Sequence, residues 1–161
     1  MSKYKKHFNY EPYIKSLLDF MSKHINIKPY PIIKISNKNQ GEHNVLAYTA
    51  HYAPDSKTVT LFIRHRFVKD VLRSFAHELI HHYQNLEGRL NEGDYTGQEI
   101  INDDKLMKLE EEAYLKGNIL FRSWTESLKN KLENKVEDKP TEHMKKLIKL
   151  SETQLKQLIN K

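Results

Sequence analysis

Hydrophobic and polar positions along the chain follow helical and strand-like periods in a clear order. Between Pro12 and Lys23 the apolar residues recur at helical spacing, and a proline suits the first helical turn. Two further prolines precede the β-branched run 32–36, which is typical of a strand. The runs 43–52 and 57–63 are also strand-like, and the Ala-Pro-Asp-Ser sequence between them suits a tight turn. We therefore expect a helix, a strand and a β-hairpin.

Two longer helical patterns follow this hairpin. The first begins near position 64 and stops at Gly88, a residue favoured just past a helix end. The polar stretch 89–102 contains two glycines and indicates a loop. The second pattern, 103–135, has acidic residues at its start and lysines toward its end, which matches the helix dipole. A proline-containing segment, 136–143, interrupts it.

This order predicts an α+β fold, with a small, mostly antiparallel three-stranded sheet packed by three helices. A length of 161 residues suits one domain, which we place at 1–137. The remainder, 138–161, is expected to be a linker and a short amphipathic helical tail. In this tail Ser151 and Gln154 suit a capping box, and the segment could dock to a partner protein.

Composition narrows the possible functions. The chain is 38% hydrophobic and 30% charged, which is typical of a globular protein. It has no apolar stretch of bilayer length, and its start lacks the apolar core of a secretion signal, so we expect a cytoplasmic protein without a membrane partner. Because the chain has no cysteine, any bound metal must use His, Asp or Glu.

The net charge of +6 raises the possibility of a nucleic-acid partner. The lysines, however, are scattered along helices and tails. Only the N-terminus and the run 129–161 are locally basic, and neither is interleaved with aromatic residues that could stack on bases. A solvated basic surface is therefore favoured over nucleic-acid binding.

The helix after the hairpin carries the sequence His-Glu-x-x-His, formed by His77, Glu78 and His81. Shuffling this composition would yield the pattern about 0.04 times. At 100° per residue the two histidines share one side, opposite an apolar side, so we expect both imidazoles outside the core. They can point at one ion while Glu78 lies where it can reach a metal-bound water. The alternative is a His-rich solvated helix face.

A catalytic zinc site usually takes a third protein ligand. Downstream of His82, the only histidine is His143, which follows the proline break, so a carboxylate is favoured. Helical projection places Glu110 within the apolar face of the helix 103–135, where an unpartnered carboxylate is costly. Small residues three and seven positions later would allow a close approach to the His-Glu-x-x-His helix. These features select Glu110, with Glu111 as the alternative.

The sequences His-Glu-Leu-Ile-His and, some thirty residues later, Glu-Glu-Glu-Ala-Tyr-Leu-Lys-Gly resemble the His-Glu-x-x-His and Glu-x-x-Ala motifs of gluzincin metallopeptidases. The resemblance spans about residues 57–124 and extends to minimal zincins and small peptidases of tailed phages. It implies Zn²⁺ held by His77, His81 and Glu110, with Glu78 as the general base and acid. A phage origin would place the protein in the host cytoplasm or the virion. In gluzincins an Asp or Asn often follows the Ala of the Glu-x-x-Ala motif, whereas this chain has Tyr114 at that position.

The implied reaction is hydrolysis of a peptide or protein substrate. Zinc lowers the pKa of its bound water, and Glu78 accepts the water proton and later protonates the leaving amine. If the strand 57–63 is the sheet edge beside the cleft, it could bind an extended substrate by main-chain hydrogen bonds. Four other side chains could stabilise the oxyanion, without a sequence feature that chooses among them: His51, Tyr95, Tyr114 and Arg122.

Two alternative functions stay open. A SprT-like protease that acts on DNA-bound proteins would suit the basic charge, but its third ligand is a histidine. A binding or phage-particle module in which zinc only stabilises the fold would leave Glu78 without a role. We also expect His82, on the apolar side of its helix, to be a hydrogen-bonded core residue rather than a ligand.

Overall fold

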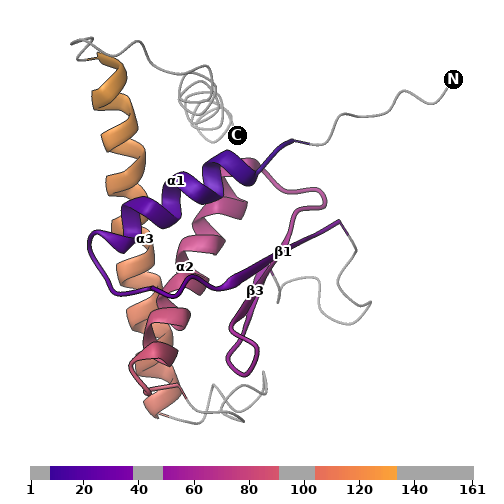
Figure 1. The fold of residues 1–161 in the computed structure, drawn as a ribbon, viewed down its shortest axis with the longest axis vertical. Coiled ribbons are helices and arrows are strands. Elements are labelled where there is room, and N and C mark those ends of the chain that lie inside the picture. The colour runs from indigo at the N-terminus through magenta and orange to yellow at the C-terminus, as the bar shows by residue number, and fades with distance from the viewer. Residues whose placement is uncertain (1–7, 38–48, 91–103, 134–161) are drawn as a thin grey trace, which may run out of the picture.

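The computed structural model describes residues 8–37, 49–90 and 104–133, which form an α+β fold as predicted (Figure 1). The expected linker and tail at 138–161, including the capping box, lie outside the described residues, as does most of the predicted loop 89–102. The elements in chain order are α1 (Glu11–Ser22), β1 (Ile32–Ser36), β2 (Ala50–Ala53), β3 (Thr58–Phe62), α2 (Val68–Leu86) and α3 (Asp104–Glu133).

The sheet has the strand order β1-β3-β2. The predicted hairpin is confirmed, because β2 pairs antiparallel with β3, with Tyr52 opposite Val59. However, β1 pairs parallel with β3, with Ile33 opposite Val59, so only one of the two pairings is antiparallel. Val59 and Leu61 of β3 are fully buried, whereas Ile32 and Ile35 of β1 are exposed, and this burial places β3 in the centre.

The hypothesis that the strand 57–63 is the sheet edge is therefore wrong. The main chain of β3 already pairs with β1 on one side and with β2 on the other. A peptide can add only to a strand with unpaired main-chain groups. In the described sheet, the edge strands are β1 and β2.

Helix α1 buries one face against the other helices. Pro12 stands in its first turn, as expected for a residue without an amide hydrogen to donate. The indole Nε1 of Trp124 on α3 donates a hydrogen bond to Ser16 Oγ on α1, at 3.1 Å. The buried face comprises Tyr13, Ile14, Leu17, Leu18 and Met21.

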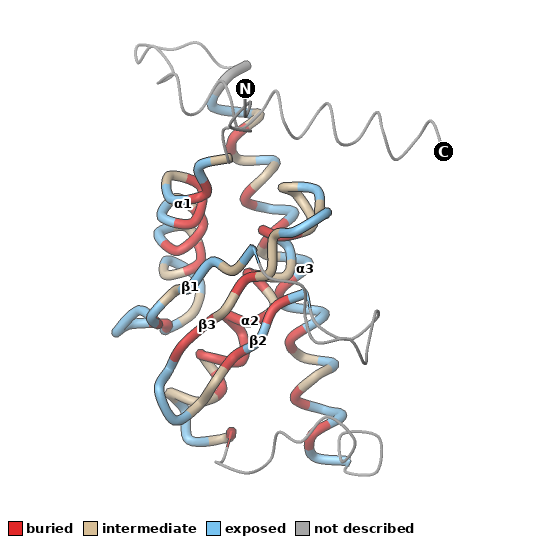
Figure 2. The backbone as a smooth tube through the Cα atoms, turned by 90° about the vertical axis from the view of Figure 1, so that its right-hand side faces the viewer, coloured by how far each residue is buried: buried red, intermediate tan, exposed pale blue. Residues whose placement is uncertain are grey.

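Helix α2 is the central element of the fold, with the sheet on one side and α3 on another (Figures 1 and 2). It ends before Gly88, whose φ of 74° is the left-handed conformation that glycine adopts readily. Buried residues occur on almost every side of this helix. The expectation that both motif histidines lie outside the core is therefore wrong for His81, which is 1% exposed, because α3 covers that side of α2.

His82 is a core residue, as predicted. It is fully buried, and its two ring nitrogens lie 2.8 Å from the Tyr52 hydroxyl and 2.8 Å from the carbonyl oxygen of Pro29. Burial lowers the pKa of His82. Its imidazole therefore ties α2 to β2 and to the segment before β1, and it is occupied by these contacts rather than available to a metal.

Helices α2 and α3 lie in close contact at Gly117. A Cβ atom built on Gly117 would lie 3.1 Å from His77 Cα and 3.2 Å from His77 N. These contacts are with backbone, which cannot move aside as a flexible side chain can. The predicted role of small residues on α3 is thus confirmed.

None of the helices in the described ranges has the length and apolar composition needed to cross a lipid bilayer.

Replacing Gly117 with Val should lower the free energy of unfolding by about 1–3 kcal/mol, the usual cost of overpacking a close contact. The added methyl groups would push α3 away from α2 at His77. Thermal and urea unfolding measure the change. Ser123→Val is the matched control, because Ser123 is exposed on the same helix. Equal stability of the two variants would contradict the close approach.

Candidate metal centre

Helices α2 and α3 bring three potential metal ligands together. His77 Nε2 lies 2.8 Å from Glu110 Oε1, and His81 Nε2 lies 3.1 Å from Glu110 Oε2. The two imidazole Nε2 atoms are 3.2 Å apart. One turn of α2 separates the histidines, so both rings project from the same side of a rigid helix toward α3.

The spacing of these atoms fits one metal ion. A tetrahedral ion with bonds of about 2.0–2.1 Å keeps its nitrogen and oxygen donors about 3.3 Å apart. The two imidazole nitrogens, 3.2 Å apart, are close to this value, and each lies about as near to one of the two Glu110 oxygens, at 2.8 Å for His77 and 3.1 Å for His81. The three residues therefore could hold a metal ion.

Glu110 is the only one of the three consecutive glutamates that joins this cluster. Glu111 is exposed to solvent. Glu112 instead accepts hydrogen bonds of 2.7 and 3.0 Å from the guanidinium of Arg89, just beyond α2. The choice of Glu110 over Glu111, made from the apolar face of α3, agrees with this placement.

Charge and hydrogen bonding link the three residues of the cluster. Burial opposes ionisation of Glu110, but the hydrogen bonds from His77 and His81 outweigh it and hold the pKa of Glu110 well below its usual range. Burial likewise opposes protonation of His81, but hydrogen bonding to Glu110 and the charge of Glu78 give a net rise in its pKa. The cluster thus pairs a carboxylate with two imidazole rings.

Glu78 is also buried, with only 8% of its surface exposed. Burial raises the pKa of Glu78, and the nearby positive charges of His81 and His77 oppose this rise. Its carboxyl group therefore interacts electrostatically with the cluster and lies outside the group of three converging ligands.

Gln84 is a site residue that the sequence interpretation missed. Its amide Nε2 donates a hydrogen bond to the carbonyl oxygen of Leu109, at 2.8 Å, so its Oε1 faces His81 Nδ1, also at 2.8 Å. An amide oxygen only accepts, which places a proton on His81 Nδ1 and directs Nε2 toward Glu110. The sequence did contain a signal for Gln84. It follows His81 by three residues, and this helical spacing places its amide near the side of α2 that carries the histidines.

The described side chains that could stabilise the oxyanion lie in different parts of the fold. The Tyr114 ring centroid lies 4.4 Å from that of His77, and Tyr114 is 60% exposed. Arg122 lies farther along α3 and pairs with Glu126 at 3.3 Å. His51 is an exposed residue of β2, and Tyr95 is outside the described residues. Of the described candidates, Tyr114 is the one in ring contact with the cluster.

Comparison of the chain with protein-family models, with curated proteins and with solved structures gives no match. The cluster of His77, His81 and Glu110 is compatible with the zincin-like motif that the sequence resembles. Any functional conclusion therefore depends on the arrangement of these residues and on their chemistry.

Proposed function

We propose that this protein is a zinc-dependent metallopeptidase of the gluzincin type that hydrolyses peptide bonds. The observation that supports this proposal most is the convergence of two imidazoles from α2 and a carboxylate from α3, with Glu78 between the two histidines in sequence. Two histidines and one glutamate form a donor set that catalytic zinc sites use.

His77, His81 and Glu110 are the proposed zinc ligands. Gln84 orients His81, and the packing of Gly117 against the His77 backbone holds α3 close enough for Glu110 to reach both rings. When bound, zinc supplies Lewis acidity, which activates water and polarises the substrate carbonyl. The rigid helix pair keeps these ligands in register, so little ordering is needed when the metal binds.

Glu78 is the proposed general base and acid. A carboxylate directly after the first histidine ligand accepts a proton from the attacking water and then transfers it to the departing amine. Tyr114 lies against the His77 ring with an exposed side chain, so its hydroxyl is the proposed donor to the oxyanion. The substrate is therefore a peptide or protein segment that can enter beside α3.

The identity of the third ligand favours this class over a SprT-like protease. In the SprT-like family a histidine fills that position, whereas Glu110 lies there in this protein. A zinc module without catalysis would need the same three ligands and gives no role to the buried Glu78. The peptidase proposal accounts for that residue.

Metal analysis combined with peptide digestion tests the proposal. We expect about one zinc per chain after purification without chelator, and cleavage of a peptide library whose products are identified by mass spectrometry. Removal of zinc by a chelator should abolish cleavage, and added zinc should restore it. A chain that binds no metal, or a zinc-loaded chain that cleaves nothing in the library, would contradict the proposal.

Replacing Gln84 with Met should weaken zinc affinity about 10–100-fold, the usual effect of losing the hydrogen-bond partner of a ligand. Met retains approximate length, but its thioether is only a weak acceptor for a hydrogen bond from His81 Nδ1 and cannot donate one to Leu109. Competition with a chromogenic chelator measures the affinity. Asn85→Met is the control, because Asn85 bonds to Tyr52 and Pro54 rather than to a ligand. Equal affinities of the two variants would rule out this role for Gln84.

A further inference from the structure

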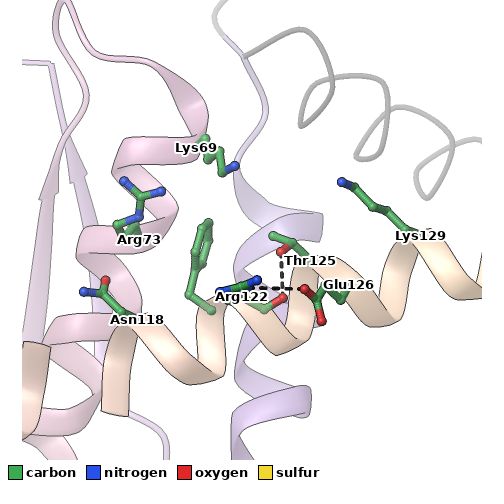
Figure 3. Close-up of a pocket in the computed structure, with 8 residues that line it drawn as sticks. Lys69, Arg73, Asn118, Arg122, Thr125, Glu126 and Lys129 are labelled. Carbon is green, nitrogen blue, oxygen red and sulfur yellow. Dashed lines mark hydrogen bonds and ion pairs between the residues drawn. The ribbon is translucent and has the colours of Figure 1, made fainter. Parts of the chain in front are cut away.

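A basic pocket of about 540 Å³ is lined by residues of α2 and α3 (Figure 3). Lys69 and Arg73 enter it from α2, and Arg122 and Lys129 enter it from α3. The single carboxylate in its lining is that of Glu126. Its positive side chains therefore outnumber its negative ones, which makes it a candidate site for an anionic group.

The pocket and the candidate metal centre are formed by the same pair of helices, α2 and α3. Arg73 precedes His77 by four residues, which is one helical turn or about 6 Å. On α3, the pocket residue Asn118 directly follows Gly117, which lies against the His77 backbone. The Arg73 guanidinium lies 5.6 Å from the Phe121 ring, so the two helices are in contact at the pocket.

Like charges are crowded in this pocket. The pKa of Lys69 is lowered, first by burial and then by the positive charges of Arg73 and Lys129. Two acidic residues partly offset the cations, since Asp70 lies 3.5 Å from Arg73 and Glu126 lies 3.3 Å from Arg122. An anion placed among these side chains would relieve the repulsion between them.

The residues that line the pocket favour a peptide over a nucleic acid as its ligand. Binding of single-stranded nucleic acid uses aromatic faces on which bases stack, along an extended basic track. Phe121 is the one aromatic residue that lines the pocket, and it is 3% exposed with Arg73 near its ring. The four cations are instead confined to one pocket between two helices.

We propose that this pocket binds acidic side chains of the peptide substrate close to the scissile bond. The inference rests on the proposed peptidase function. Lys69 lies two turns before His77, or about 12 Å along the helix. Because an extended peptide advances about 3.3 Å per residue, the acidic positions fall roughly two to four residues from the reacting carbonyl. The pocket thus selects substrates with Asp or Glu on one side of the cleaved bond.

Matched peptides test this specificity. A neutral peptide taken from the library products is compared with versions carrying two Glu residues, two to four positions before or after the cleaved bond. One acidic version should have at least about a fivefold higher kcat/KM, mainly through KM, and lose this advantage at high salt. Lys129→Glu should reduce the ratio of acidic to neutral kcat/KM by about fivefold or more. The exposed Lys108→Glu, with the same charge change outside the pocket, should leave the ratio unchanged.

Binding measured without turnover separates this inference from the peptidase proposal. Fluorescence anisotropy of the labelled acidic peptide with the Glu78→Gln variant should show salt-sensitive binding that Lys129→Glu weakens. If no peptide is cleaved but this binding persists, the peptidase proposal fails and the acidic-peptide pocket stands. If peptides are cleaved without acidic preference, or Lys129→Glu and Lys108→Glu behave alike, the pocket inference is overturned. Stronger, Lys129-dependent binding of a twelve-nucleotide oligothymidylate would also overturn it.

Discussion

We expect Glu78→Gln to keep zinc bound and to lower kcat for peptide hydrolysis by about 10²–10⁴-fold, the range expected when a general base is removed. The amide has nearly the volume of the carboxyl group but cannot accept the proton of the attacking water. Because Glu78 lies outside the three converging ligands, its replacement leaves the metal donors intact. Zinc content by mass spectrometry and kcat on the best library peptide measure the two effects separately.

Glu87→Gln serves as the control for this variant. Glu87 lies just after α2, is exposed and pairs with Arg89, so the same chemical change there should leave kcat within about twofold of the original value. Retention of full activity in the Glu78 variant would show that Glu78 is not the general base of the reaction. Loss of zinc from the Glu78 variant would instead show that its carboxylate supports the metal.

We expect Glu110→Ala to lower zinc affinity by more than about 100-fold, beyond the effect expected for an outer hydrogen-bond partner. The change would remove one of the three proposed donors and leave only the two imidazoles to bind the ion. It would also remove the carboxylate that pairs with both rings. Competition with a chelator measures affinity, and peptide hydrolysis should fall with metal content.

Glu111→Ala provides a close control for the third ligand. Glu111 neighbours Glu110 but is exposed, so the variant should retain the zinc affinity and kcat of the unmodified chain. If Glu111→Ala loses zinc and Glu110→Ala does not, the assignment of the third ligand is wrong. If both variants keep zinc, the two histidines bind it with a ligand from elsewhere in the chain.

The candidate site could be predicted from the sequence because its ligands obey helical periodicity. His77 and His81 are one turn apart, which puts them on one side of any helix that contains them. Glu110 could be selected because a carboxylate on an apolar face requires a partner. Gln84 could not be selected in the same way, because its function depends on Leu109, a residue from another helix.

The order of hydrophobic and polar residues by itself determined that helices and strands form and which residues share a helix face, since these follow from local backbone geometry. Only the tertiary structure decided that β3 is central, that β1 lies parallel to it and that His81 is buried. It also decided that Gly117 lies against His77 and that four basic side chains of α2 and α3 line one pocket. Local periodicity cannot specify these features, because each depends on which surfaces of distant segments exclude water together.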